Sequence, residues 1–309
     1  MFCITLQWGL WNQLFQYAFW QVLAKQYNTR VTYDTGIYHT WSLFSLACFL
    51  GIFTPRSLQL SRFAITLDHP TLFQRRKLWM TGIHKILKLI GIKNRHMYDE
   101  KPWFIYDDSR FHLDVQQDYL CTGYRNIARY YESIKDSIKS QLILRNESTD
   151  LQHLSNTIQQ QQKNGIQTVS IHIRWWDYIK LGMVVCDIQY YQRALKEIQK
   201  TIEKDNLHLY IFCDDPDHLP IDISLFDEYT TTRIIFDDYY IAQWIDQHWF
   251  DDVEKFILMS RCQHHIIANS TYSRRWAWLG SNSSITIAPK LWLSKVSSEH
   301  IVPDTWLRV

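Results

Sequence analysis

The fold is decided by residues 2–34, which read FCITLQWGLWNQLFQYAFWQVLAKQYNTRVTYD. The pattern predicts an apolar strand over residues 2–6 and, from about Asn12, a helix whose apolar side chains recur at helical spacing. A second strand is predicted over residues 29–33. Strand, crossover helix and strand form the repeating unit of parallel sheets. We therefore expect an α/β fold whose loop over residues 7–13 lies at the carboxyl end of the first strand, where ligands of such sheets bind.

The second half of the chain repeats this alternation more regularly. Short runs rich in β-branched and aromatic residues predict strands, and longer segments with apolar residues at helical spacing predict helices between them. The expected strands cover residues 168–173, 208–213, 233–236, 265–268 and 284–288, and the expected helices cover residues 187–203, 250–262 and 271–279. This alternation indicates a second parallel, doubly wound sheet.

The length of the chain predicts two domains. A chain of 309 residues is too long for one unit of this kind and suits two that share a cleft. The polar, glutamine-rich residues 150–165 are the expected boundary. We therefore expect two Rossmann-like domains, residues 1–155 and residues 156–309, whose parallel sheets face a cleft.

Composition and charge limit the class of partner and the compartment. The formal net charge of +2 is too small to indicate a nucleic-acid partner. The six cysteines are scattered without a Cys-x-x-Cys pair, which is typical of reduced, buried thiols rather than of disulfides or a zinc site. The sequence shows no charged leader and no apolar run of about 18 residues, so we expect a cytoplasmic protein.

Residues 71–95 form a basic stretch in which lysine and arginine interleave with leucine, isoleucine and tryptophan. One interpretation is a helix on an anionic membrane surface, with peripheral contact through residues 75–95. The other is a helix packed on the core with a solvated basic face. The sequence leaves both open.

Three predicted strands of the second half end in polar residues. These residues are His172 and Arg174 at the end of the first strand with Asp177 beyond it, Asp214 and Asp215 after the second, and Asn269, Ser270 and Thr271 after the fourth. The carboxyl ends of parallel strands meet at one edge of a sheet, so we expect these residues to lie close together. A guanidinium and backbone N–H groups at a helix start are the donors that a nucleotide diphosphate needs. The pattern therefore predicts a nucleotide-binding edge.

Each of these segments also has a purely structural interpretation. Arg174 and Asp177 can form an ion pair at the strand end, and the Asn-Ser-Thr segment can simply cap the helix that follows it. The two aspartates before Pro216 are typical of a turn. The same aspartates invite a metal-binding interpretation, which we reject, because an arginine can offset the charge of a leaving diphosphate instead.

Three sequence blocks resemble the bacterial alpha-1,2-fucosyltransferases. Residues 8–20 read WGLWNQLFQYAFW where that family has Gly-Gly-Leu-Gly-Asn-Gln-[Leu/Met]-Phe-Gln-Tyr-Ala-Phe-Gly. Residues 172–178 read HIRWWDY where it has His-x-Arg-Arg-Gly-Asp-Tyr. Residues 266–279 read IIANSTYSRRWAWL where it has Ile-Ile-Ala-Asn-Ser-[Thr/Ser]-Phe-Ser-Trp-Trp-Gly-Ala-Trp-Leu. The blocks occur in the family's order across nearly the whole chain.

The resemblance implies an inverting glycosyltransferase of GT-B type that needs neither cofactor nor metal. It would move fucose from GDP-fucose to the 2-hydroxyl of a galactoside in a surface glycan. The first domain would bind the acceptor, a galactose-containing oligosaccharide or lipid-linked glycan, and the second would bind the nucleotide sugar.

The resemblance also assigns roles to single residues. Arg174 would contact the diphosphate, and His172 or Asp177 would orient that arginine or act as the base. The other donor-binding residues would be Asp214, Asp215, Asn269, Ser270, Thr271 and Ser273 in the second domain, with Gly9, Asn12 and Gln13 in the loop of the first.

The departures from the family pattern follow a rule. Tryptophan replaces the family's glycine at Trp8, Trp11, Trp20, Trp176 and Trp276, arginine replaces its tryptophan at Arg125, Arg274 and Arg275, and Trp175 replaces its second arginine. The chain has only nine glycines in 309 residues, about 3%, where roughly 7% is usual, and it has 14 tryptophans. One hypothesis is an inactive relative that binds glycan or nucleotide. The other is a gene that reads UGA as glycine and CGA or CGG as tryptophan, translated with the wrong table.

Overall fold

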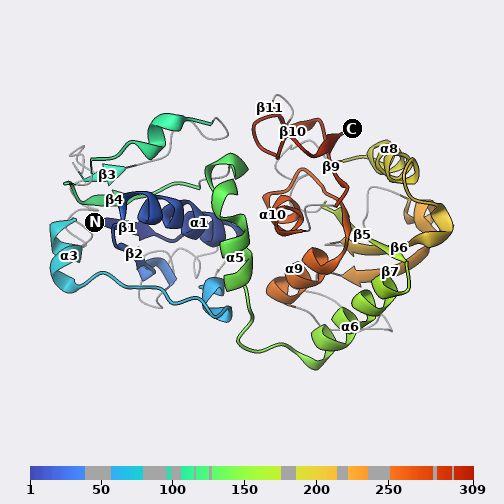
Figure 1. Cartoon of the computed structure of the whole chain (residues 1–309), viewed down its shortest axis with the longest axis horizontal. Coiled ribbons are helices and arrows are strands. Elements are labelled where there is room, and N and C mark those ends of the chain that lie inside the picture. Colours follow the sequence, from blue (N-terminus) through green and yellow to red (C-terminus); the bar gives the residue numbers. More distant parts are fainter. Residues whose placement is uncertain are drawn as a thin grey trace, which may run out of the picture. The chain divides into compact units, whose positions relative to one another are not determined.

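The computed structural model describes residues 1–38, 57–78, 96–98, 106–114, 116–124, 127–174, 186–213, 222–235, 251–280, 284–293 and 296–309. These residues form two compact units, Met1–Arg145 and Asn146–Val309 (Figure 1). The expected boundary at residue 155 falls inside helix α6 (Thr149–Lys163), so the chain divides ten residues earlier than expected. The glutamine-rich segment is a helix of the second unit because its apolar residues, Leu151, Leu154 and Ile158, are buried there.

The described part of the first unit contains a parallel sheet in the order β2-β1-β4-β3. Its strands are β1 (Phe2–Thr5), β2 (Val31–Asp34), β3 (Met97–Tyr98) and β4 (Tyr119–Cys121). Its helices are α1 (Leu10–Tyr27), α3 (Leu72–Lys77) and α5 (Lys135–Gln141), with 3-10 turns at Gly36–Tyr38, Gln59–Arg62, Asp108–Phe111, Ala128–Tyr130 and Glu132–Ile134. The strand, helix and strand expected over residues 2–34 are therefore confirmed.

Helix α1 is the crossover from β1 to β2 and carries much of the core of this unit. Leu14, Phe15 and Phe19 are fully buried on it. The helix ends at Asn28, which adopts the left-handed conformation at φ 44° and donates its backbone N–H to the carbonyl of Ala24. Asparagine tolerates this conformation better than most residues, so the helix stops there without much strain.

The second unit contains a parallel sheet in the order β12-β9-β8-β5-β6-β7 (Figure 1). Its strands are β5 (Gln167–Ile173), β6 (Leu207–Cys213), β7 (Thr230–Ile235), β8 (His264–Ile266), β9 (Thr286–Ala288) and β12 (Leu307–Arg308), and β10 (Leu291–Leu293) pairs with β11 (Val296–Ser297) in a separate hairpin. Its helices are α6, α8 (Ile188–Gln199), α9 (Asp252–Arg261) and α10 (Thr271–Leu279), with 3-10 turns at Lys204–Asn206 and Ile223–Phe226. The two parallel sheets confirm the expected α/β class.

The strand order of the second unit places a topological switch point between β5 and β8. From β5 the chain adds β6 and β7 on one side, and it then returns to add β8, β9 and β12 on the other. This is the order of dinucleotide-binding folds, in which the ligand lies outside the carboxyl ends of the two central strands.

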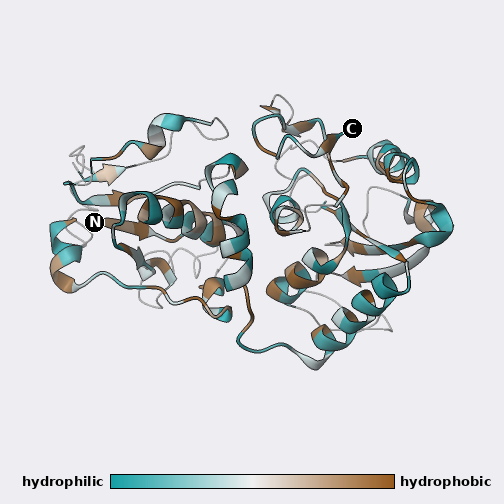
Figure 2. Ribbon diagram, viewed as in Figure 1, coloured by the Kyte–Doolittle hydropathy of each residue, from teal (hydrophilic) through white to brown (hydrophobic). Residues whose placement is uncertain are grey.

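The hydropathy pattern explains why the second unit folds as layers. In Figure 2 the brown, hydrophobic residues gather on the strands, whereas α6 and α8 are largely teal. The apolar core includes Val169 and Ile171 of β5 and Leu209 and Ile211 of β6, all at most 2% exposed. A strand buried on both faces reads as a nearly continuous apolar run, which is why the sequence predicts these strands well.

The described cysteines agree with the expectation of reduced thiols. Cys3, Cys121, Cys186, Cys213 and Cys262 are buried, and none of these five forms a disulfide. Burial raises the pKa of the Cys3 and Cys186 thiols to about 12. They are therefore protonated at neutral pH and unsuited to nucleophilic chemistry.

Candidate functional site

The candidate site lies at the switch point of the second unit. Strands β5 and β8 are direct neighbours, with Val169 opposite His264 and Ile171 opposite Ile266. Their carboxyl ends therefore lie side by side. On its other side β5 pairs with β6, with Ile173 opposite Cys213. The structure thus brings together all three predicted strand ends: the one that leads to Arg174, the one that leads into α10, and the end of β6, which precedes Asp214.

His172 is buried next to this edge. Its side chain is 1% exposed, and its ring stacks on the ring of Tyr272 in α10, with 5.2 Å between the centroids. Burial lowers its pKa well below the usual value, and the positive charge of Arg174 lowers it further. The imidazole is therefore neutral at pH 7. Its burial fits a residue that supports the site better than one that takes a proton directly from a sugar hydroxyl.

Arg174 follows β5 and is half-buried. Arg174 is the residue directly after β5, so it lies at the carboxyl end of this strand, next to the neighbouring strand end that leads into α10. The effect of its charge on the pKa of His172 agrees with this placement. Asp177, Asp214 and Asp215 lie outside the described residues.

The side chain of Asn269 is used within the protein. Its Nδ2 donates to the carbonyl of Trp292 at 3.0 Å, and its Oδ1 accepts from the thiol of Cys186 at 3.8 Å. The residue is only 1% exposed. Asn269 therefore holds the turn between β8 and α10 in place, and any donor contact there would have to come from the backbone.

Ser270 and Ser273 also bond within the turn. The Oγ of Ser270 accepts from the backbone N–H of Tyr272 at 3.2 Å and so caps α10, as the structural interpretation of this segment predicts. The Oγ of Ser273 donates to the carbonyl of Ala268 at 3.1 Å. Both serines are at most 3% exposed, whereas Thr271 at the first helical position is half-buried. Of the predicted donor residues in this turn, Thr271 has the most accessible side chain.

Gln13 stabilises the loop of residues 7–13 in the first unit through hydrogen bonds. This fully buried side chain donates to the carbonyls of Trp8 at 2.7 Å and Ser57 at 2.8 Å, and it accepts from the N–H of Leu60 at 3.1 Å. Gly9 precedes α1 as its N-cap without contributing a side chain, and Asn12 is half-buried in the first turn. Gln13 therefore shapes the loop at the carboxyl end of β1 and does not project from it.

Two tyrosines of α8 support the switch point and were missed in the sequence. Tyr190 donates its hydroxyl to the carbonyl of Ile267 at 2.5 Å, just after β8. Tyr191 donates its hydroxyl to the carbonyl of His172 at 2.8 Å, near the end of β5. In the sequence, both tyrosines are spaced so that they share a helix face with Ala194. This spacing is equally typical of ordinary core packing, so it does not reveal their hydrogen bonds to the strand ends.

Lowering the pH should destabilise the protein through His172. Below the unfolded pKa of about 6.5 the unfolded chain binds a proton that the folded chain, with its lower pKa, does not bind. Stability should therefore fall by about 1.4 kcal/mol for each pH unit until the folded pKa is reached. Urea unfolding between pH 7 and pH 5 measures this slope. His172→Gln should make the slope shallower, with a remainder from His208 and His264, whose pKa values burial also lowers. His153→Gln on the exposed face of α6 should leave the slope unchanged, and equal slopes in all three proteins would contradict the prediction.

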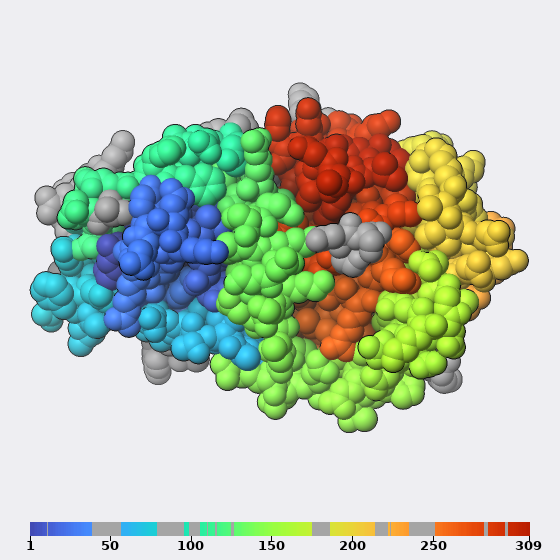
Figure 3. Space-filling model, viewed as in Figure 1, coloured from blue at the N-terminus to red at the C-terminus, as the bar shows by residue number. Residues whose placement is uncertain are grey.

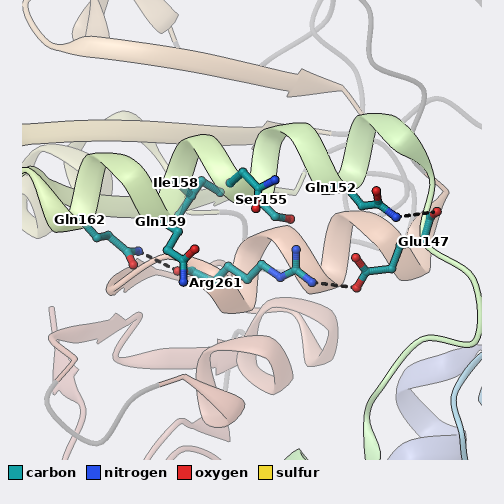
Figure 4. Close-up of a pocket in the computed structure, with 8 residues that line it drawn as sticks. Glu147, Gln152, Ser155, Ile158, Gln159, Gln162 and Arg261 are labelled. Atoms are coloured by element: carbon teal, nitrogen blue, oxygen red, sulfur yellow. Dashed lines mark hydrogen bonds and ion pairs between the residues drawn. The ribbon is translucent and has the colours of Figure 1, made fainter.

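A pocket of about 470 Å³ lies between α6 and α9 (Figure 4). Arg261 and Glu147 form an ion pair of 2.9 Å in its wall, and Gln162 donates to the carbonyl of Arg261 at 2.8 Å. None of the predicted site residues lines it. The hydroxyl of Ser155 is buried at its edge with no hydrogen-bond partner among the described residues.

Replacement by alanine should change stability in opposite directions at Ser155 within α6 and at Ser148, the N-cap of that helix. Ser155→Ala should raise the free energy of unfolding by about 1 kcal/mol, because it removes a buried hydroxyl that has no partner and adds a better helix former. Ser148→Ala should lower it by about 1 kcal/mol, because the Ser148 Oγ caps the helix by accepting from the N–H of Leu151 at 3.1 Å. Urea unfolding measures both. A loss of stability in both variants would show that the Ser155 hydroxyl is satisfied, for example by water in the pocket.

Comparison with known proteins gives matches over nearly the whole chain. The model of glycosyl transferase family 11 matches residues 1–307. The O-antigen biosynthesis glycosyltransferase WbnK of Escherichia coli is 25% identical, with 97% of this chain and 98% of that protein covered. An alpha-1,2-colitosyltransferase of Escherichia coli is also 25% identical, with 97% and 96% covered.

Among solved structures, the NodZ alpha-1,6-fucosyltransferase soaked with GDP-fucose is 12% identical, with a TM-score of 0.48 and coverage of 93% of this chain and 94% of that one. A second structure, fucosyltransferase NodZ from Bradyrhizobium, is 13% identical, with a TM-score of 0.47 and coverage of 89% and 92%.

Proposed function

The chain belongs to glycosyl transferase family 11, and on this premise we propose that it transfers fucose from GDP-fucose to the 2-hydroxyl of a galactoside in a surface glycan. The transfer inverts the configuration at the sugar carbon and needs no metal. The second unit binds the nucleotide sugar, and the first binds the galactose-containing acceptor. The relatives support a glycosyl transfer with this linkage, since one is an O-antigen biosynthesis glycosyltransferase and the other an alpha-1,2-colitosyltransferase.

The observation that carries this proposal is that Arg174 and the start of α10 follow neighbouring strands, β5 and β8, at the switch point. The loss of GDP places negative charge on the departing diphosphate. A guanidinium can bind two of its oxygens, and the N-terminus of a helix contributes backbone N–H groups and a positive partial charge. Both kinds of donor lie at one sheet edge, so both can stabilise the same leaving group. Asp214 and Asp215 follow the neighbouring strand in the sequence and complete the proposed nucleotide pocket.

In the proposed reaction the acceptor hydroxyl attacks the anomeric carbon from the face opposite GDP. The bond from that carbon to the phosphate oxygen breaks, and its electron pair leaves with GDP. The hydroxyl proton passes to a base, for which we propose Asp177, because the neighbouring candidate His172 is buried against Tyr272. His172 is then a positioning residue that supports Arg174. Gly9, Asn12 and Gln13 shape the loop of the acceptor-binding unit.

Release of GDP from GDP-fucose, measured over a panel of galactosides, tests the activity. We expect release that depends on a terminal galactose and that persists in a chelator. The NMR spectrum of the product should show an alpha linkage to the 2-position. Turnover only with a nucleotide-linked colitose, or a different linkage, would overturn the proposed donor or linkage within the family.

A catalytically inactive relative is the second candidate, and Trp8 favours it. This residue adopts φ 68°, and its ring stacks against Tyr124 with 6.5 Å between the centroids, beside the carboxyl ends of β1 and β4. An indole there fills space where the family has glycine. Calorimetric titration with GDP separates the candidates, since GDP binding without turnover over the whole acceptor panel would identify a binding protein.

A further inference from the structure

Helix α3 exposes two large apolar side chains in succession. Leu72 is 79% exposed and Phe73 is 74% exposed, the highest fractions among the large hydrophobic residues of the described chain. Figure 3 shows the cyan segment that contains this helix at the surface of the first unit. An adjacent pair of this size in water usually marks a surface that meets a partner.

The exposure results from an ordered helix start and not from a frayed end. A capping box closes the helix, in which the side chain of Thr71 accepts from the N–H of Gln74 at 3.3 Å and that of Gln74 accepts from the N–H of Thr71 at 2.7 Å. The other end of the helix is tied to the sheet, since Arg75 pairs with Asp34 at 2.5 Å and Leu78 is fully buried. The helix is thus anchored at its back, and Leu72 and Phe73 project from it.

Basic residues follow this pair on the same helix. Arg76 and Lys77 are exposed, and Lys77 forms an ion pair with Asp118 at 2.5 Å. In the sequence, residues 71–95 contain seven basic residues and no acidic one, whereas the whole chain carries only +2, so the other 284 residues carry −5 between them. The stretch is therefore a local basic feature of a chain that is otherwise acidic.

From this combination we propose that the first unit docks on an anionic membrane surface through Leu72, Phe73 and Arg76. Apolar side chains that enter the headgroup region, next to lysine or arginine that meets anionic lipid, are the chemistry of interfacial anchors. A polyanion without an apolar phase, such as a nucleic acid, would leave the two apolar side chains in water. No helix of the described chain can span a bilayer. Docking of this kind would bring the site to acceptors carried on lipid, but the proposal stands without the proposed activity.

Cosedimentation of the full chain with vesicles tests the proposal. We expect binding to phosphatidylcholine vesicles that contain about a third phosphatidylglycerol, little binding to pure phosphatidylcholine, and a decrease as salt is raised. The double variant Leu72→Ser with Phe73→Ser should lower the partition coefficient at least tenfold, and Arg76→Gln should lower it about fivefold. The matched control is Ile143→Ser, which removes a side chain that is 64% exposed in the same unit and should leave binding unchanged.

The changed side chains are exposed, so all three variants should keep the thermal midpoint of the parent protein, which checks that they fold. Equal binding to neutral and anionic vesicles, or wild-type binding by the double variant, would overturn the proposal. So would retention on dextran sulfate without retention on vesicles, which would indicate a soluble polyanion. GDP titration of the same variants should be unaffected, so failure of membrane docking and failure of the proposed transferase activity are distinguishable.

Discussion

Arg174→Ala should reduce fucosyl transfer by about 10²- to 10³-fold, the usual cost of removing one donor from a developing negative charge. Binding of GDP should weaken as well, by roughly 10- to 150-fold, because a charge-assisted hydrogen bond contributes about 1.5–3 kcal/mol. Two properties make this the residue with the largest effect. It follows the first central strand of the switch point, and its charge acts on the buried His172.

Release of GDP and calorimetric GDP titration measure the two effects. Arg233→Ala is the matched control, because Arg233 lies on β7 of the same sheet and pairs with the exposed Asp227 at 3.0 Å, away from the switch point. Arg174→Lys should restore only part of the activity, since an ammonium cannot replace the two-pronged contact of a guanidinium. Wild-type transfer and wild-type GDP binding in Arg174→Ala would remove this residue from the site.

The sheet framework could be predicted from the sequence because its signals are local. Each of the five strands expected in the second half occurs within three residues of its expected ends, and α10 has the expected bounds. Buried parallel strands and crossover helices have different apolar periods, and these can be counted. The short strands β3 and β10 lie in segments without such a period and were not predicted.

The hydrogen-bond partners of individual polar side chains could not be predicted in the same way. Asn269 and Gln13 were expected to bind the donor, yet each makes buried hydrogen bonds to the protein backbone. An amide has the same residue type whether it meets a ligand or a carbonyl. Only the three-dimensional neighbourhood separates the two, whereas the capping role of Ser270 could be predicted because it depends on nearby residues.

Several residues that depart from the family pattern lie in energetically unfavourable environments. Trp8 adopts φ 68°, in the left-handed region that costs a bulky L-residue roughly 1–2 kcal/mol and that glycine adopts freely. Arg274 and Arg275 are both 0% exposed and adjacent on α10, so two like charges are withdrawn from water together. The indole N–H of the fully buried Trp276 has no acceptor among the described residues.

Trp20 behaves differently. It is 1% exposed and packs against Phe2 and Phe19, with 5.2 Å between the ring centroids in each pair. An indole is well accommodated there, so this position does not distinguish a genuine tryptophan from a misread glycine. Trp11, Arg125, Trp175 and Trp176 do not test the idea either, because no side-chain environment is described for them.

Sequencing the gene should find UGA at the codons of Trp8 and Trp276, and CGA or CGG at those of Arg274 and Arg275. Correct translation would place glycine at the left-handed turn and tryptophan in the buried helix, where each replaced arginine removes a desolvated charge.

The corrected chain carries Trp8→Gly, Trp11→Gly, Trp20→Gly, Trp176→Gly, Trp276→Gly, Arg125→Trp, Arg274→Trp and Arg275→Trp. Its free energy of unfolding should exceed that of the printed chain by several kcal/mol, so its urea midpoint should be higher. It should also bind GDP-fucose more tightly in calorimetry. Trp20→Gly alone should destabilise the printed chain, because it leaves a cavity in the aromatic core, so the expected gain in stability has to come from the other changes. UGG codons at positions 8 and 276, AGA or AGG codons at 274 and 275, or a corrected chain less stable than the printed one would contradict the recoding hypothesis and leave a protein whose site is filled by its own aromatic side chains.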